Sequence, residues 1–244
     1  MLSIFKKKPL LASLIPNTFC DIHSHCLPQI DDGAQDINES KTLLLGMQKL
    51  GFSKIITTPH TFPGLWDNTP ATITGAYTAL YGQEPELCNL VELGFASEYL
   101  ISKPLIKSAE ENTLLCIKDR FVLVEMSYLN PPLGLFDILF QLKALGYFPI
   151  LAHPERYFFY HDTWRVYEKL KEAGCYFQLN LLSVVGYYGT SVTKIADKLL
   201  AHNMIDFVGS DIHHKRHVDA FYRKIKIKSQ TALEKAIHAN QVFV

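Results

Sequence analysis

Short apolar runs alternate along the chain with longer segments in which apolar residues recur every three or four positions. The first pattern is typical of buried strands, and the second of helices that bury one face. The predicted strands span residues 14–20, 54–58, 87–96, 120–124, 148–152, 176–180 and 205–209. The predicted helices span residues 36–50, 69–81, 132–145, 163–173 and 191–202, followed by a helical tail from about residue 218 with a second segment at 229–239.

This order of elements favours an α/β fold with a largely parallel sheet or barrel. The 244 residues hold about seven β/α units, and a chain of ~200–250 residues can form a single domain of this class. We therefore predict one domain at residues 18–244 and an N-terminal extension at residues 1–17. The apolar patch in the extension has no clear cleavage site, so we do not interpret it as a signal peptide.

Composition narrows the class of protein. Hydrophobic residues make up 48% of the chain and charged residues 20%, as in ordinary globular proteins. The formal net charge is zero, so no overall field attracts nucleic acid. No apolar run approaches the ~20 residues of a membrane span. Basic runs at residues 6–8 and 223–228 are interpreted as solvated surface charge, which leaves at most peripheral membrane contact.

The cysteine pattern indicates a reducing compartment. Five cysteines are scattered along the chain without a Cys-x-x-Cys pair, which argues against a disulfide scaffold and predicts a cytoplasmic protein. No cysteine has an arginine six positions later, so the Cys-x5-Arg loop of thiol-based phosphatases is absent. The sequence leaves the oligomeric state open.

Two histidines lie at the end of the first predicted strand, in the segment Asp21-Ile-His23-Ser-His25. Residues two apart in a strand point the same way, so both imidazoles should project from one edge with Asp21 behind them. Imidazole nitrogens suit Zn, Mn, Fe and similar ions. A single pair of this kind is weak evidence, because it also describes two partly exposed histidines at a strand end.

Residues of the same kind follow other predicted strands. Six of the seven end in His, Asp or Glu, and the sixth strand ends in Asn180 instead. Each such residue alone could be a loop histidine, a helix-capping acid or a satisfied core histidine, but those explanations do not predict a shared end of one sheet. Active sites of parallel barrels form at this end. The candidate metal ligands are His23, His25, Asp32, His60, Glu98, Glu125, His153, Asp211 and His213.

The number of candidate ligands suggests more than one ion. Nine ligands exceed the about four that zinc takes, and suit two or three ions with bridging carboxylates. Four carboxylates against three divalent cations leave a positive excess, which favours a phosphate dianion. Closely spaced metals activate water and stabilise the attacking and leaving oxygens of an in-line displacement. Oxygen and nitrogen ligands without thiolate favour Mn, Fe or Zn over Mg or Ca alone.

The motifs, in this order, resemble those of the polymerase-and-histidinol-phosphatase (PHP) superfamily, and most closely its bacterial protein-tyrosine phosphatase branch of the CpsB/CapC/YwqE type. The motifs are Asp21-x-His23-Ser-His25, Asp31-Asp32-Gly33, Thr58-Pro59-His60, Glu98, Val124-Glu125-Met126, Ala152-His153-Pro154-Glu155-Arg156-Tyr157 and Ser210-Asp211-x-His213. The resemblance implies a distorted seven-stranded (β/α)7 barrel and three divalent metal ions, with Mn favoured and Fe or Zn as alternatives. It also implies hydrolysis of phosphotyrosine on the tyrosine-rich tail of a bacterial tyrosine kinase that controls capsule and exopolysaccharide synthesis.

The resemblance further implies an assignment of ligands to ions. One ion would be held by His23, His25, Glu98 and Asp211, a second by Glu98, Glu125 and His153, and a third by Asp32, His60 and His213. Asp32 and Glu125 stand where many relatives have histidine, which favours the tyrosine-phosphatase branch over histidinol phosphatase. Asp21 is expected to orient a histidine rather than to bind metal.

Two arginines are the candidate catalytic residues. The planar fork of Arg156 suits bidentate binding of phosphate, and the alternative is a surface ion pair with Glu155. The resemblance implies a second arginine after the Ser-Asp-x-His motif. Arg216 lies slightly earlier than expected, with Lys215 or Arg223 as substitutes.

Aromatic segments at residues 62–66, 157–160 and 187–188 fall in loops on the ligand side, where they could line the mouth for a phosphotyrosine ring or simply pack. The main alternative function is a small-molecule phosphatase of the same superfamily, with a histidinol-phosphate-like substrate. A nuclease is disfavoured because no basic groove is evident. A non-catalytic module is disfavoured because every ligand position is filled.

Overall fold

The structure, a computed structural model, describes residues 7–244. Nine strands in this range pair only in parallel and form two sheets, one in the order β1-β2-β4 and one in the order β3-β5-β6-β7-β8-β9. The strands are β1 (Phe19–Asp21), β2 (Phe52–Thr57), β3 (His60–Thr61), β4 (Leu93–Phe95), β5 (Glu98–Leu100), β6 (Phe121–Glu125), β7 (Phe148–Ala152), β8 (Tyr176–Asn180) and β9 (Phe207–Gly209). The predicted α/β fold with a parallel sheet is confirmed, whereas a single closed seven-stranded barrel is not.

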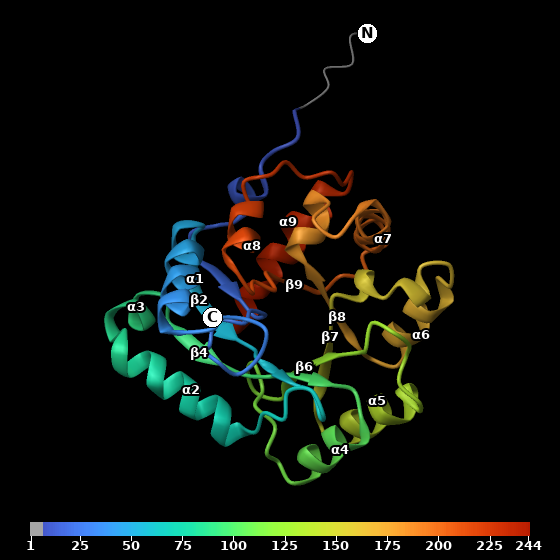
Figure 1. The fold of residues 1–244 in the computed structure, drawn as a ribbon. Helices are drawn as coiled ribbons and strands as arrows, with labels where there is room; N and C mark the ends of the chain where they lie inside the picture. Colours follow the sequence, from blue (N-terminus) through green and yellow to red (C-terminus); the bar gives the residue numbers. More distant parts are fainter. Residues whose placement is uncertain (1–6) are drawn as a thin grey trace.

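Helices surround the strands (Figure 1). They are α1 (Ile37–Lys49), α2 (Pro70–Gln83), α3 (Pro85–Leu90), α4 (Lys103–Glu110), α5 (Leu135–Ala144), α6 (Arg165–Glu172), α7 (Thr190–Ala201), α8 (Lys215–Ala220) and α9 (Gln230–Ala239). Short 3-10 turns are η1 (Leu11–Leu14), η2 (Pro154–Arg156), η3 (Phe158–Tyr160), η4 (Leu181–Val185) and η5 (Asn240–Phe243). The helices predicted at 36–50, 69–81, 132–145, 163–173, 191–202 and 229–239 are confirmed to within a few residues.

Two extended segments of the chain, β2 with β3 and β4 with β5, begin in one sheet and continue in the other. Pro59 separates β2 from β3 and has no N–H to donate to a ladder. Its carbonyl accepts bonds from Glu98 N at 3.1 Å and Ser97 Oγ at 2.8 Å, so the neighbouring break between β4 and β5 lies beside it. On the N-terminal side of the breaks β2 pairs with β4. On the C-terminal side β3 pairs with β5, and His60 lies in register with Glu98. The breaks therefore bring two candidate ligands side by side.

The outer strands of the two sheets also meet. Ser24, after β1, forms an isolated parallel bridge with Ile212, after β9. The buried amide of Asn240 ties the same two strands together from the C-terminal segment. It donates to Cys20 O at 2.9 Å and to Val208 O at 2.8 Å, and accepts from Val208 N at 3.0 Å. The first and last strands of the described chain are thus held against each other.

Alternation along the strands decides which side chains face the site. In β6, Val122 and Val124 pack into the cluster beneath the outer helices, and Leu123 packs into a separate inner cluster. Residues two apart share a face, so Glu125 points to the inner side with Leu123. In β7 the same parity places Ala152 in the inner cluster. The inner apolar cluster therefore lies on the side of the sheet to which Glu125 points.

The predicted strand at 87–96 is wrong over its first half, where the chain forms α3. Pro85 occupies the first turn of this helix, a position that favours helix formation because its missing N–H costs nothing there. Leu87 and Cys88 are buried while Leu90 is 59% exposed, which is a helical and not an alternating pattern. The strand β4 begins only after Glu92, which has a φ of 38° and turns the chain.

Three further elements differ from the prediction. The apolar run at 14–20 contributes only its last two residues to β1, and residues 11–14 form the 3-10 turn η1. The helix α4 was not predicted, although Leu105, Ile106 and Ala109 are buried at helical spacing. The tail helix α8 begins at Lys215 rather than near residue 218 and ends at Ala220.

The described part of the predicted N-terminal extension packs on the domain. Leu11 is fully buried, and its N–H donates to Arg223 O at 3.0 Å. Lys8 Nζ donates to Ile227 O at 2.7 Å. The rest of the basic start, Lys6, lies outside the described residues. None of the helices formed by residues 7–244 has both the length and the apolar composition of a membrane span.

Candidate metal centre

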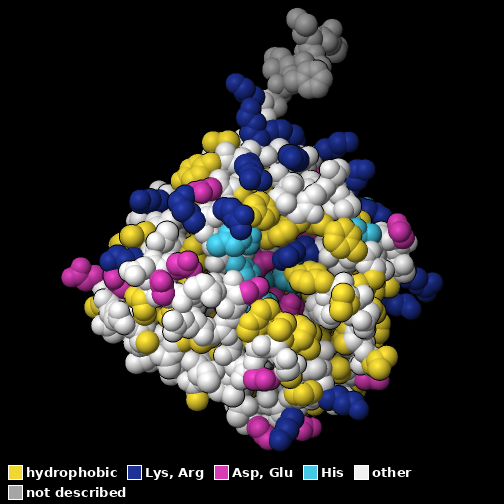
Figure 2. All heavy atoms as spheres, viewed as in Figure 1, with side chains coloured by type: hydrophobic (Ala, Val, Ile, Leu, Met, Phe, Trp, Pro, Cys, Tyr) yellow, Lys and Arg dark blue, Asp and Glu magenta, His cyan; other side chains and the backbone are white. Residues whose placement is uncertain are grey.

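All nine candidate metal ligands gather at one end of the strands. Figure 2 shows histidine and acidic side chains inside a hollow in this face, with hydrophobic side chains around its rim. Eight of the nine are buried or nearly so, and the ninth, Asp32, has a side chain that is 52% exposed. The parallel arrangement causes the convergence, because the C-terminal ends of parallel strands lie at one edge.

Glu98 lies at the centre of the group. Its Oε2 is 3.1 Å from His23 Nε2, 3.5 Å from His25 Nε2 and 3.2 Å from His60 Nδ1, and its Oε1 is 3.2 Å from His153 Nε2. Glu98 is fully buried. One carboxylate thus faces four imidazoles from three segments of the chain, which is the position of a bridging ligand.

Asp211 faces two groups of partners. Its Oδ1 is 3.3 Å from His23 Nε2, 3.5 Å from His25 Nε2 and 3.4 Å from His213 Nδ1. Its Oδ2 accepts from Arg156 Nη1 at 2.6 Å and from Asn180 Nδ2 at 2.8 Å. Asp211 and His153 have φ values of 50° and 37°, and strained backbone of this kind clusters at functional sites.

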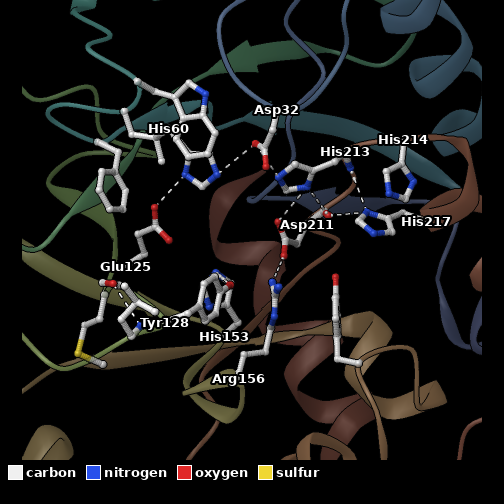
Figure 3. Close-up of a pocket in the computed structure, with 17 residues that line it drawn as sticks. Asp32, His60, Glu125, Tyr128, His153, Arg156, Asp211, His213, His214 and His217 are labelled. Carbon is white, nitrogen blue, oxygen red and sulfur yellow. Dashed lines mark hydrogen bonds and ion pairs between the residues drawn. The ribbon is translucent and has the colours of Figure 1, made fainter. Parts of the chain in front are cut away.

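The outer ligands surround His60 at the mouth of the hollow (Figure 3). His60 Nδ1 is 2.9 Å from Glu125 Oε1, and its Nε2 is 3.5 Å from Asp32 Oδ1. The same Asp32 oxygen is 3.4 Å from His213 Nε2. Asp32 therefore bridges two histidines that come from opposite ends of the chain.

The ligand atoms fall into four overlapping groups, each compact enough to hold one ion. The groups are His25–Asp32–His60–His213, His23–Glu98–His153, His23–His25–Asp211 and His60–Glu98–Glu125. They resemble the ion assignments expected from the sequence, with His23, His25 and His60 each shared between two groups instead of serving one ion. The overlap follows from the short distances around Glu98.

Several of these atoms are buried without a hydrogen-bond partner among the described residues. They are His23 Nε2, His25 Nε2, His60 Nδ1, Glu98 Oε2, Glu125 Oε1 and His153 Nδ1. An unsatisfied buried polar atom costs about 1–3 kcal/mol, so six at one place call for a partner of another kind. All six are nitrogen or carboxylate-oxygen atoms of metal-ligand type, and divalent cations fit them.

Hydrogen bonds behind the histidines fix their orientation. His23 Nδ1 lies 2.7 Å from Gln178 Oε1, and His25 Nδ1 lies 2.7 Å from Asp31 Oδ2. Both contacts turn Nε2 toward the cluster, as is usual for metal-binding histidines. The expectation that Asp21 orients a histidine is wrong, because its carboxylate accepts from the N–H and hydroxyl of Ser210 instead.

The charges in the cluster shift one another's pKa values in opposite directions. Burial raises the pKa of Glu98, but the charges of His23 and His60 outweigh it and hold the value well below its usual range. Burial, followed by repulsion from Glu98, raises the pKa of Glu125 to about 7. Burial likewise lowers the pKa of His153 to about 4. Burial lowers the pKa of His23, but the charges of Glu98 and Asp211 outweigh it and raise the value to about 9, so a proton on this imidazole competes for the place that a divalent cation would occupy.

A cavity of about 560 Å³ opens over the cluster. Its lining comprises Asp32, His60, Phe62, Leu65, Trp66, Glu125, Met126, Ser127, Tyr128, Leu129, His153, Arg156, Tyr188, Asp211, His213, His214 and His217. Of the predicted aromatic segments, 62–66 and 187–188 contribute to the wall. Tyr157 is buried in the core beside it.

Arg156 is the arginine that lines this cavity in the described chain. The alternative ion pair with Glu155 is not formed, because the Glu155 carboxylate accepts from Asn180 N and Ser183 Oγ. Arg216 is exposed on α8 and lines a separate hollow beside α1. Of its two substitutes, Lys215 pairs with Asp219 on the surface, and Arg223 contacts the ring of Tyr187.

Several residues that hold the site together are not among those predicted from the sequence. Gln178 and Asn180 had a visible signal, since both are polar residues of the same parity in an otherwise apolar strand. Asp31 adjoins the predicted ligand Asp32, and its place in the Asp31-Asp32-Gly33 motif is its signal in the sequence. Tyr128 and His217 had no signal, because each reaches the cavity from a loop or helix with ordinary composition.

Known proteins are similar to this chain in sequence and in fold. The model of a family described as capsular polysaccharide synthesis, CpsB/CapC, matches residues 19–238. Tyrosine-protein phosphatase YwqE of Bacillus subtilis is 29% identical over 80% of this chain and 77% of its own length, and tyrosine-protein phosphatase CpsB of Streptococcus pneumoniae is 27% identical over 80% and 82%.

A solved chain from the crystal structures of YwqE and CpsB, described as unique metal-dependent tyrosine phosphatases, superimposes with a TM-score of 0.77. It is 28% identical, and the match covers 88% of this chain and 86% of that one. The family match spans all nine strands of the described chain and every candidate ligand. This chain belongs to the CpsB/CapC family of capsular polysaccharide synthesis.

Proposed function

We propose that this protein is a metal-dependent protein-tyrosine phosphatase. The observation that carries the proposal is the position of Arg156, which lies in the wall of the same cavity as six of the nine clustered ligands. A phosphate ester placed there meets cations on one side and a guanidinium on the other. The similarity to tyrosine-protein phosphatases YwqE and CpsB supports the same activity.

The ligand groups fit three divalent ions, with Mn favoured and Fe or Zn as alternatives. We assign one ion to His23, His25, Glu98 and Asp211, a second to Glu98, Glu125 and His153, and a third to Asp32, His60 and His213. Bound ions would supply Lewis-acid stabilisation of the phosphoryl oxygens and lower the pKa of water. Glu98 would be shared, as its contacts with four imidazoles indicate.

The chain's own residues bind and orient the phosphate. Arg156 uses one N–H on Asp211, which leaves its other donors for two oxygens of a phosphoryl group. Asn180 donates to the same Asp211 oxygen and keeps that carboxylate turned toward the ligands. A phenol has a pKa near 10, so tyrosinate leaves with less help from a general acid than a serine alkoxide does.

The upper wall suits an aromatic ring. Phe62 and Trp66 pack edge to face with centroids 6.2 Å apart, and Trp66 stacks on His60 at 4.6 Å. Tyr128 and Leu129 line the same cavity. We propose that the ring of phosphotyrosine lies between these walls, while its phosphate reaches Arg156.

We also infer that the strands form one distorted seven-stranded barrel. β2 with β3, and β4 with β5, are each separated by only two residues and continue in the same direction. Counting each pair as one strand gives seven, in the order of the chain. The bridge between Ser24 and Ile212 supports closure between the first and the last.

We propose a cytoplasmic protein that acts on the phosphotyrosine tail of a bacterial tyrosine kinase controlling capsule and exopolysaccharide synthesis. The five cysteines are all free, which supports a reducing compartment. An open cavity rimmed by apolar side chains supports a flexible peptide as substrate (Figure 2). Neither a nucleic-acid partner nor more than peripheral membrane contact is part of the proposal.

A comparison of three substrates tests the function. The Mn-loaded protein is incubated with a phosphotyrosine peptide, the matching phosphoserine peptide and histidinol phosphate, and released phosphate is measured. We expect the phosphotyrosine peptide to have the highest kcat/KM. A preference for histidinol phosphate would support the alternative, a small-molecule phosphatase, and overturn the proposal.

A further inference from the structure

Two tyrosine rings contact the guanidinium of Arg156. The Cζ atom of Arg156 lies 4.1 Å from the ring centroid of Tyr188 and 4.9 Å from that of Tyr128. Both distances are within the ~6 Å range of cation–π contacts. The rings come from different parts of the fold, one from the loop after β6 and one from the loop after η4.

Each ring is itself held by the site. Tyr188 Oη accepts from Asn180 Nδ2 at 3.1 Å, and the same amide group donates to Asp211. Tyr128 stacks on the imidazole of His153 with centroids 5.6 Å apart and an interplanar angle of 26°. The two rings are therefore fixed relative to the ligand cluster and not only to Arg156.

The two rings restrict the orientation of the guanidinium plane of Arg156, which one hydrogen bond cannot do. The bond from Arg156 Nη1 to Asp211 fixes one end of the guanidinium but leaves rotation about that contact free. A planar fork binds two phosphate oxygens only when its plane is set. The contacts with two rings restrict that plane, and the low dielectric near aromatic groups strengthens the attraction.

We propose that Tyr128 and Tyr188 are positioning residues that orient Arg156 for bidentate binding of the phosphoryl group. This inference rests on the proposed phosphatase function only for its biological use, because orientation of the arginine also governs binding of free phosphate. Both rings act through the flat guanidinium, so their effect should depend on an arginine at position 156.

The test measures binding of inorganic phosphate to the Mn-saturated protein by calorimetry. Tyr128→Leu and Tyr188→Leu remove a ring, and Tyr128→Phe and Tyr188→Phe keep it. We expect each leucine variant to weaken phosphate binding about five- to tenfold, in line with a desolvated cation–π contact, and each phenylalanine variant to stay within about threefold. Mn stoichiometry should remain that of the wild type. Tyr222→Leu, at an exposed tyrosine away from the cavity, is the control and should bind phosphate normally.

A second background separates positioning from packing. In Arg156→Lys, the charge remains but the plane is lost, so we expect the leucine substitutions to change phosphate affinity by less than about twofold there. Equal losses in both backgrounds, or phenylalanine variants as weak as the leucine variants, would show that the rings only shape the cavity. Should Tyr188→Leu fail to fold, the half-exposed Tyr128 carries the test alone.

The outcome is independent of the proposed function. A protein that shows the expected pattern with phosphate but does not hydrolyse phosphotyrosine peptide retains the positioning role and loses the phosphatase assignment. The opposite result is a protein that hydrolyses the peptide but whose leucine substitutions weaken phosphate binding equally with Arg156 and with Arg156→Lys. Such a protein retains the phosphatase assignment and loses the positioning role. A wild-type protein that binds no phosphate when saturated with Mn overturns the positioning role directly.

Discussion

Arg156 and Asp211 share a short hydrogen bond of 2.6 Å, from Nη1 of the arginine to Oδ2 of the aspartate (Figure 3). The other oxygen of Asp211 faces three histidines of the ligand cluster. One carboxylate therefore joins the side chain proposed to bind phosphate to the residues proposed to bind the metals. Burial raises the pKa of Asp211, but the charges of His23, His213 and Arg156 outweigh it and hold the value well below its usual range.

Removing the carboxylate of Asp211 should impair both metal binding and the positioning of Arg156. We expect Asp211→Ala to lose Mn and to lower turnover of a phosphotyrosine peptide by about 10²-fold or more, because a proposed ligand and the arginine's partner disappear together. His153→Ala should lose Mn and turnover while leaving the Arg156–Asp211 bond in place. Elemental analysis of protein purified without chelator and steady-state kinetics measure the two effects.

The control for these variants is Asp219→Asn, which breaks an exposed ion pair with Lys215. Such pairs contribute about 0.2–1 kcal/mol, so metal content and turnover should stay as in the wild type. Full turnover in both Asp211→Ala and His153→Ala would refute the ligand assignment.

The two candidate arginines should behave differently. Arg156→Lys keeps a charge but loses the planar fork, and we expect kcat/KM for phosphotyrosine peptide to fall by about 10²-fold, as for other lost transition-state donors. Arg216→Ala should change it by less than about threefold, because this side chain is exposed outside the cavity. A large loss in Arg216→Ala with an intact fold would return Arg216 to the phosphate site and contradict its placement.

The sequence could predict that the candidate ligands converge, because their positions at one edge depend on chain direction alone. Parallel strands place every C-terminal end at one edge, so His60, Glu125 and His153 could be assigned to one site without knowing the sheet order. The breaks that set His60 beside Glu98 were less visible. Pro59 marks one of them, but Ala96-Ser97 has no turn signal and lies in an apolar run.

Contacts between distant loops could not be predicted in this way. Tyr128 and Tyr188 are sixty positions apart and reach Arg156 only because β6, β7 and β8 pair in register. Similarly, the apolar residues around Leu87 fit both a strand and a buried helix, and packing against α1 and α2 adds to the effect of Pro85 in favouring the helix. Periodicity describes one element at a time, whereas these features depend on several.

Gly209 leaves room for His23, and filling that space should disturb the cluster. A Cβ at this position would lie 2.6 Å from His23 Cβ and 2.6 Å from Gln178 Nε2. We expect Gly209→Ala to cost roughly 1–3 kcal/mol of stability and to lower Mn content, because His23 or its partner must move. Urea unfolding and elemental analysis give the two quantities.

The matched control is Gly75→Ala within α2, where an added Cβ meets no atom within 4 Å. It should stabilise the protein by about 0.5–1 kcal/mol, since alanine favours the helix. Wild-type Mn content in Gly209→Ala would mean that His23 is not a ligand or that the cluster tolerates its displacement.

Glu155 should make stability fall as the pH rises. Its carboxyl is fully buried beside η4, and this burial raises its pKa to about 7, against the hydrogen bonds from Ser183 and Asn180. In the unfolded chain a glutamate titrates near pH ~4.3. Between these values the folded protein keeps a proton that the unfolded chain has released, so the free energy of unfolding decreases as the pH rises through this window.

Glu155→Gln removes that dependence, because the amide stays neutral. Urea unfolding of metal-free protein at pH 5 and pH 8 should show the wild type losing on the order of 2–3 kcal/mol more than Glu155→Gln does. Glu168→Gln, at an exposed position of α6, should follow the wild-type curve. If the loss between the two pH values is as large in Glu155→Gln as in the wild type, the buried carboxyl is not its source, and the titrating group must be sought among the carboxylates of the ligand cluster.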